Sequence, residues 1–122
     1  MDVRFVVGTC RALTALVHEG KLIAGLYYRL NECRLPLPAL RDRRGDIPRL
    51  CRRFLREISR ERGTPPPALS AGARAWAARQ EWPGDVLQLR ETLRRVVALE
   101  PATSVIEPAH LKAAVEQHPP IP

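Results

Sequence analysis

Apolar residues recur at helical spacing through the later two thirds of the chain. Between positions 47 and 58 they fall on one face of a helix: Ile47, Leu50, Cys51, Phe54, Leu55 and Ile58. Asp46 is expected to cap this helix with its carboxylate, and Pro48 suits the first turn, where no N–H partner is needed. Gly63 and the prolines at 65–67 are expected to end it.

Three more helices are predicted after this one. The first opens at Leu69 and Ser70. The second begins near Asp85, where Gln88 three residues later resembles a capping box. The third has Pro108 at its first helical position, after a short loop. Each carries apolar residues able to cover its neighbours, so a four-helix unit is predicted over residues 42–117. Residues 118–122 are predicted to be a disordered tail.

The first third has a different pattern. Residues 3–8 are apolar and rich in β-branched side chains, which is typical of a strand buried on both faces of a parallel sheet. Two short helices should follow, one closed by Gly20 and one around 22–30. Residues 33–37 predict a second short strand, and Pro36 indicates that it is an edge strand or that it ends there. The expected fold is mainly α, with two strands and two helices from an α/β core over residues 1–41.

Composition narrows the classes of function. The 122 residues carry 20 Lys and Arg against 13 Asp and Glu, a net charge of +7. This charge favours anionic partners, although a solvated arginine-rich surface is the preferred explanation. Three cysteines, at 10, 33 and 51, form no CxxC pair, so neither a disulfide framework nor a metal site is predicted. No apolar run is long enough for a membrane span, and a cytoplasmic location is expected.

Four passages together resemble one known family. They are Asp2-Val3-Arg4-Phe5-Val6, Leu26-Tyr27-Tyr28-Arg29-Leu30-Asn31, Leu35-Pro36 through Asp46-Ile47-Pro48, and Trp82-Pro83-Gly84-Asp85-Val86. In this order they resemble the C-terminal part of the AAA+ ATPase domain of sigma-54-dependent transcriptional activators, the bacterial enhancer-binding proteins. The likeness implies that residues 1–41 are a remnant of the α/β AAA+ core and residues 42–117 a helical lid. It also implies ATP and magnesium as cofactors, a homo-oligomeric ring, and sigma-54 RNA polymerase as partner.

The resemblance assigns roles to five positions. Arg29 corresponds to an arginine that reaches the neighbouring subunit's γ-phosphate, and Ile47 to a residue that lines the adenine. The other three positions depart from the family pattern. Cys10 stands where the family has asparagine, and Ile23 and Leu87 stand where it has arginines. An isoleucine or leucine cannot stabilise developing phosphate charge.

Several sequence features of an active ATPase do not occur in these residues. No phosphate-binding GxxxxGK[ST] motif is present, nor the acidic magnesium-binding strand or the GAFTGA loop that contacts sigma-54. The first hypothesis is therefore a truncated, degenerate member that does not hydrolyse ATP alone. The second is a basic helical module that binds nucleic acid without sequence preference; sequence-specific DNA binding is not expected. The third takes Met1 as a misplaced start of a full activator ATPase.

Overall fold

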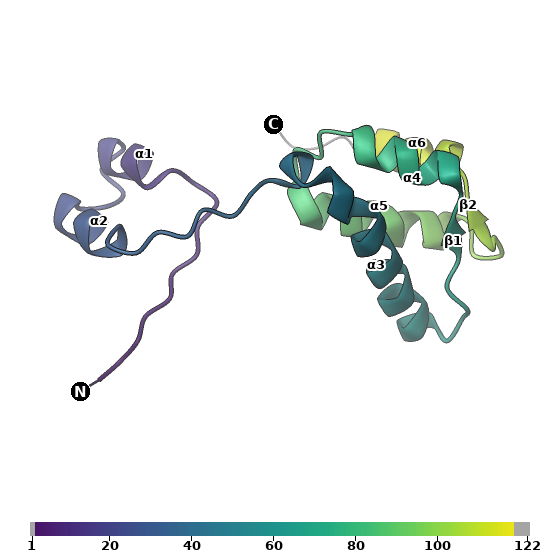
Figure 1. Ribbon diagram of the computed structural model, residues 1–122, viewed down its shortest axis with the longest axis horizontal. Coiled ribbons are helices and arrows are strands. Elements are labelled where there is room, and N and C mark those ends of the chain that lie inside the picture. The colour runs from purple at the N-terminus through teal and green to yellow at the C-terminus, as the bar shows by residue number, and fades with distance from the viewer. Residues whose placement is uncertain (1, 119–122) are drawn as a thin grey trace. The chain divides into compact units, whose positions relative to one another are not determined.

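The computed structural model describes residues 2–118, and the chain forms two compact units, one ending at Leu37 and the other beginning at Pro38 (Figure 1). The predicted boundary between residues 41 and 42 falls inside the short 3-10 helix η1 (Leu40–Asp42). Of the predicted tail, only His118 belongs to the described residues. The prediction of a mainly helical fold is confirmed.

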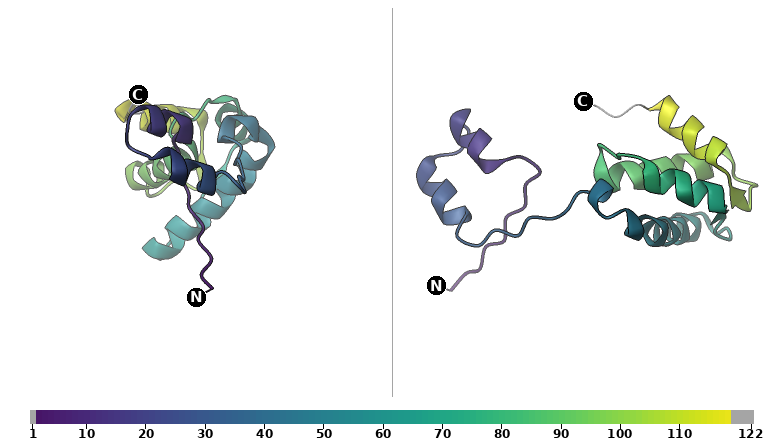
Figure 2. Two further views of the ribbon diagram at one scale, coloured as in Figure 1. Left: turned by 90° about the vertical axis from the view of Figure 1, so that its left-hand side faces the viewer. Right: turned by 45° about the horizontal axis from the view of Figure 1, so that its top comes forward.

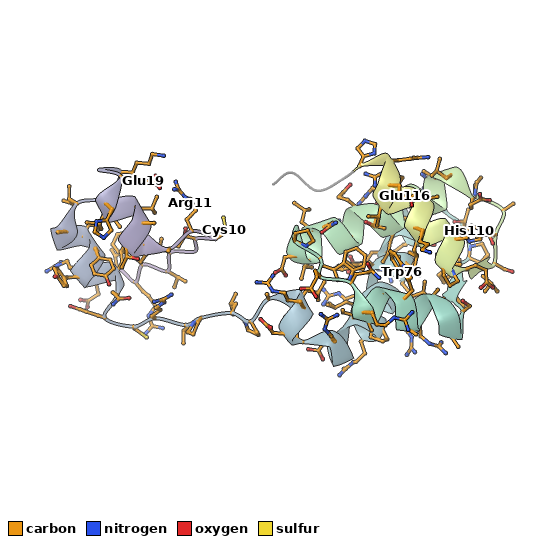
Figure 3. The ribbon with its side chains drawn as sticks, turned by 90° about the horizontal axis from the view of Figure 1, so that it is seen from above. Cys10, Arg11, Glu19, Trp76, His110 and Glu116 are labelled. Atoms are coloured by element: carbon orange, nitrogen blue, oxygen red, sulfur yellow. The ribbon has the colours of Figure 1, made fainter. Side chains whose placement is uncertain are left out.

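The first unit contains two short helices, α1 (Leu13–His18) and α2 (Ala24–Leu30). Gly20 follows α1 with φ of 73°, a left-handed conformation that glycine adopts without strain. Glu19 lies between two cations: its carboxylate is 2.6 Å from the Arg11 guanidinium (Figure 3) and 3.1 Å from the Lys21 ammonium. Arg11 first, and then Lys21, hold the pKa of Glu19 below its ordinary value.

Neither of the two predicted strands of the first unit is a strand in the structure. Residues 3–8 and 33–37 have no ladder partner, and Phe5 and Val6 are 83% and 90% exposed. β-branched residues favour a strand, but a strand needs neighbours that pair its backbone N–H and C=O groups and cover its side chains. The described residues supply no such neighbour to either segment, so the predicted positions of the strands are wrong.

The second unit contains all four predicted helices: α3 (Ile47–Arg62), α4 (Ala71–Arg79), α5 (Asp85–Leu99) and α6 (Pro108–Gln117). Helix α3 packs against α4 and α5, and α6 packs against α4 and α5 (Figure 2). Their inward faces form one apolar core, to which η1 adds Leu40. The most deeply buried large side chains are Trp82, Leu40, Ile47, Leu55, Ile58, Leu89, Leu93, Ile106 and Leu111.

A two-stranded parallel sheet closes one end of this unit. Strand β1 (Ala68–Leu69) pairs with β2 (Val105–Ile106), with Ala68 opposite Val105 and Leu69 opposite Ile106. The sequence did not predict these strands, because two residues are too few for a recognisable alternation. Each strand leads into a helix, so the pairing fixes the starts of α4 and α6. There, a Cβ added at Gly72 would lie 3.3 Å from the Pro108 ring.

The helix ends follow the predicted signals, except at the starts of α3 and α5. Gly63 ends α3 with φ of 68°, and the Ser70 hydroxyl accepts a hydrogen bond from Ala73 N–H at 3.0 Å. Pro48 lies in the first turn of α3, as predicted. The prediction that the Asp46 side chain caps α3 is wrong. Asp46 already has helical backbone angles at the end of η2 (Arg44–Asp46), and its carboxylate instead pairs with Arg43 Nε at 3.1 Å.

Candidate functional site

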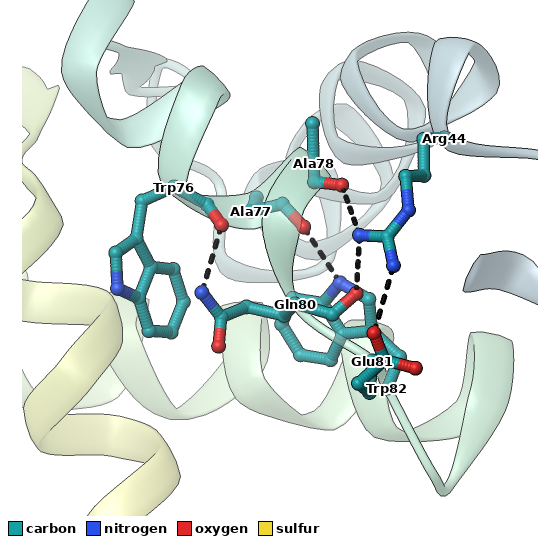
Figure 4. A network of polar contacts seen from close by, with 7 residues as sticks. All are labelled: Arg44, Trp76, Ala77, Ala78, Gln80, Glu81 and Trp82. Atoms are coloured by element: carbon teal, nitrogen blue, oxygen red, sulfur yellow. Dashed lines mark hydrogen bonds and ion pairs between the residues drawn. The ribbon is translucent and has the colours of Figure 1, made fainter.

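One edge of the second unit is held together by Arg44, which belongs to η2. Its guanidinium donates to the carbonyl oxygens of Ala78 at 2.7 Å and Gln80 at 3.1 Å, and pairs with Glu81 at 2.9 Å (Figure 4). The two carbonyls lie at the end of α4, where the last C=O groups of the helix have no N–H donors of their own. Sequence reasoning missed this role, because one arginine in a charged segment carries no distinguishing signal.

Trp82 fixes the same turn from inside. Its ring is 2% exposed, and its indole N–H donates to Ala77 carbonyl oxygen at 2.8 Å. The ring also meets Trp76 edge-to-face, with centroids 6.3 Å apart. Trp82 therefore packs the turn between α4 and α5, and this buried ring has no free face for stacking on a base.

The start of α5 is set by a strained, hydrogen-bonded turn. Trp82 and Asp85 have positive φ values of 47° and 57°, which are uncommon outside glycine. The Gln88 side chain accepts from Gly84 N–H at 2.8 Å, so the reciprocal bond expected of a capping box reaches Gly84 and not Asp85. A Cβ at Gly84 would lie 2.7 Å from Gln88 Cβ, which only glycine avoids.

Asp85 connects α5 to η1. One carboxylate oxygen accepts from Leu40 N–H at 3.4 Å, and the other from Val86 N–H at 3.0 Å. Together with Arg44 and Trp82, this contact joins η1, η2, the α4–α5 turn and the first turn of α5 into one edge, and α3 begins directly after η2. We call it the lid edge. Two of the predicted site residues, Ile47 and Leu87, lie in elements of this edge.

Ile47 and Leu87 differ sharply in exposure. Ile47 opens α3 and is 0% exposed, inside the apolar core, so its observed role is packing. Its assignment as a residue that lines the adenine stays a prediction. Leu87 lies in the first turn of α5 and is 67% exposed. An exposed leucine covers no core, and it offers no hydrogen-bond donor to a phosphate group.

The other three predicted residues belong to the first unit. Cys10 is an exposed free thiol (Figure 3). Ile23 precedes α2 as its N-cap residue and is 74% exposed. Arg29 lies in the last turn of α2 with an exposed side chain and, within residues 2–118, makes no ion pair. Their assigned roles stay predictions.

Within the described part of the chain, no three His, Cys, Asp or Glu side chains gather into a group that could hold a metal ion. The two positions where the family pattern has phosphate-binding arginines are the apolar Ile23 and Leu87. As for membranes, none of the helices over residues 2–118 has the length and apolar character to cross one.

Comparison with known proteins identifies the family to which the helical second unit belongs. Residues 41–121 match the AAA+ ATPase lid domain family. The DNA-binding transcriptional regulator NtrC of Escherichia coli (strain K12) is 41% identical over 106 residues, which is 87% of this chain and 23% of the relative. A putative response regulator NtrX-like of Rickettsia conorii is 32% identical over 104 residues, covering 85% of this chain and 22% of the relative.

Comparison with solved structures indicates the same family. The crystal structure of NtrX from Brucella abortus in complex with ADP superimposes with a TM-score of 0.75 and 29% identity, covering 93% of this chain and 27% of that chain. The second unit is thus an AAA+ lid, and the chain belongs to the AAA+ ATPase lid domain family. Its relatives are sigma-54-dependent regulators of the NtrC and NtrX type, which confirms the resemblance seen in the sequence. The chain spans less than a quarter of the length of these curated relatives.

Proposed function

We propose that this chain acts as the lid-bearing part of a sigma-54-dependent AAA+ transcriptional regulator in the cytoplasm. The observation that carries the proposal is the 41% identity to NtrC over 87% of the chain, spanning both units, together with the lid fold. In such a regulator, ATP hydrolysis in a homo-oligomeric ring drives remodelling of sigma-54 RNA polymerase. Ring assembly and the polymerase contact belong to the proposal.

The lid edge suits the role of a rigid cover. Arg44, Trp82 and Asp85 tie η1, η2, α4 and α5 together by five hydrogen bonds to backbone groups. A lid of this kind moves as one body when it closes over a nucleotide. Ile47 would lie behind the adenine, and Arg29 would reach the neighbouring subunit's nucleotide. ATP and magnesium would be bound by the assembled regulator and not by this chain alone.

The proposed regulator hydrolyses ATP poorly, because two of the arginines that would stabilise phosphate charge are absent. Leu87 is exposed at the start of α5, and Ile23 is exposed before α2. Neither is needed for the core of its unit, so an arginine would fit at either position. Loss of one such charged donor typically costs about 10²-fold or more in rate.

A chimera tests the proposal. In E. coli NtrC, the 106 residues that match this chain would be replaced by the chain's own residues. The chimera should fold and assemble, and it should hydrolyse ATP about 10²-fold or more slowly than NtrC. Adding Ile23→Arg and Leu87→Arg should recover at least about tenfold.

Leu99→Arg serves as the matched control, since Leu99 is also an exposed leucine of α5, at its other end. It should leave the rate of the chimera unchanged. A chimera as fast as NtrC would contradict the proposed loss of activity. Equal recovery by Leu99→Arg would assign the effect to charge alone, and a chimera that fails to assemble would refute the assignment of this chain as the lid-bearing part.

A further inference from the structure

The solvent-facing side of α3 carries a row of arginines. An open groove along the helix is lined by Arg49, Arg52, Arg53, Arg56 and Arg60. These positions follow helical spacing on one face, and a rise of 1.5 Å per residue spreads them over roughly 16 Å. We call this surface the arginine face. It lies on the second unit alone and involves none of the predicted nucleotide-site residues.

The acidic residues of α3 leave most of this charge uncompensated. Glu57 pairs with Arg53 at 3.0 Å. Glu61 pairs with Arg94 of α5 at 3.2 Å and not with an arginine of this face. Arg49, Arg52, Arg56 and Arg60 make no ion pair with any residue between 2 and 118.

A second hollow adjoins the groove and shares Arg56 and Arg60 with it. Its lining is completed by Ser59, Thr64 and Pro66. Ser59 is 1% exposed, and its hydroxyl has no hydrogen-bond partner among the described residues. Burying such a hydroxyl without a partner costs free energy. Because this hydroxyl is covered, the donors that the hollow offers to an anion are the guanidinium groups of Arg56 and Arg60.

The composition of this surface favours a nucleic-acid backbone over a protein partner. Arginine forks match phosphate oxygens in pairs. The lining contains no aromatic residue or large apolar anchor, which a protein interface would place at its centre. Without aromatic side chains it cannot stack on single-stranded bases either. An open, straight row of charge fits an extended anion better than a small one.

We propose that the arginine face binds the phosphate backbone of double-stranded DNA without reading its sequence. Arg49, Arg52, Arg56 and Arg60 each neutralise a phosphate. This activity is independent of nucleotide binding by the lid edge. It would hold the regulator near DNA by charge alone.

Fluorescence anisotropy of the full chain with labelled 20-base-pair duplexes tests this inference. Two duplexes of equal composition and different sequence should bind equally. Four phosphate contacts predict that the logarithm of the association constant falls with the logarithm of salt concentration with a slope of roughly −3 to −4. The double variant Arg52→Gln/Arg56→Gln should make the slope shallower by about two and weaken binding roughly tenfold or more at low salt.

The matched control removes the same charge elsewhere on the second unit. Arg41 and Arg79 are exposed and make no ion pair within the described residues. Arg41→Gln/Arg79→Gln should leave the slope nearly unchanged. If both double variants weakened DNA binding equally, the proposal would be overturned, since net charge and not the arginine face would then determine the affinity. Absence of binding at low salt, sequence preference, or equally tight binding of poly-glutamate would overturn it too.

Discussion

The carboxylate of Asp85 accepts a hydrogen bond from the backbone N–H of Leu40, 3.4 Å away and 45 positions earlier in the chain. Leu40 is completely buried, and its N–H lies at the start of η1, where no helical partner exists. This contact therefore anchors the start of the lid to α5. It also explains why an aspartate is tolerated at positive φ in that turn, since short polar side chains adopt this conformation more readily than others.

Replacing Asp85 should destabilise the second unit. Asp85→Ala leaves the Leu40 and Val86 N–H groups without their acceptors, and a loss of about 1–3 kcal/mol in the free energy of unfolding is expected. Asp85→Asn keeps one acceptor oxygen and should lose less. Urea unfolding followed by circular dichroism measures both. If the alanine variant were as stable as the parent, the contact would contribute nothing to the lid.

The indole N–H of Trp82 gives a second test. Trp82→Phe keeps an aromatic ring in the core but removes the donor to Ala77, and it also leaves space beside the smaller ring. A loss of about 2 kcal/mol or more is expected. Trp76→Phe is the matched control, because Trp76 is only partly buried and its N–H makes no hydrogen bond within residues 2–118. Equal losses in the two variants would contradict the role given to Trp82.

Much of the second unit could be predicted because its signals are local. The apolar stripe of α3, Gly63, Ser70 and Pro108 each act through neighbouring residues, and the structure has the helices where they indicate. The N-cap at Asp46 failed because η2 had already given that residue helical angles. The Arg44 fork and the β1–β2 pairing join residues more than 30 positions apart, which local patterns do not encode.

Whether the first unit contains strands could not be predicted from local patterns. Its apolar residues at 3–8 have strand character, but whether a strand forms depends on partners that the pattern does not name. For the candidate site, the resemblance located Leu87, Ile23 and Arg29. All three side chains are exposed in the structure, and exposure alone does not assign a chemical role, so their roles stay proposals.

Hydrogen exchange should separate the two units. Amides around Leu50–Ile58 and Leu89–Val97 lie in buried helices and should exchange slowly, whereas residues 3–7 have no hydrogen-bonded ladder and should exchange within the first time points. Mass spectrometry of peptides from the labelled full chain measures both. Strong protection of residues 3–7 in a monomeric sample, equal to that of α3, would refute this difference.

The buried thiol of Cys51 should make the free energy of unfolding depend on pH in the alkaline range. Burial raises the pKa of its thiol from 9.0 to about 12. Because the unfolded state loses this proton first, the free energy of unfolding should fall as pH rises from 9 toward 12. The loss between pH 9 and 10 should be roughly 1 kcal/mol.

Cys51→Ala removes the titrating group and provides the control. Its stability should fall less over the same pH range, even though it starts lower. Urea unfolding at both pH values measures the two proteins. Parallel losses in the parent and the variant would show that the buried thiol does not govern the alkaline transition.

The central claim is that this chain supplies a lid and not a complete ATPase, and titration of the purified full chain with magnesium-ATP tests it most directly. Calorimetry should detect no micromolar binding of ATP, and a phosphate-release assay on the same sample should detect no turnover. The reasons are that Ile23 and Leu87 occupy positions where the family has arginines, and that the phosphate-binding motif is absent from these residues. Micromolar affinity, or turnover that Arg29→Ala abolishes, would contradict the account.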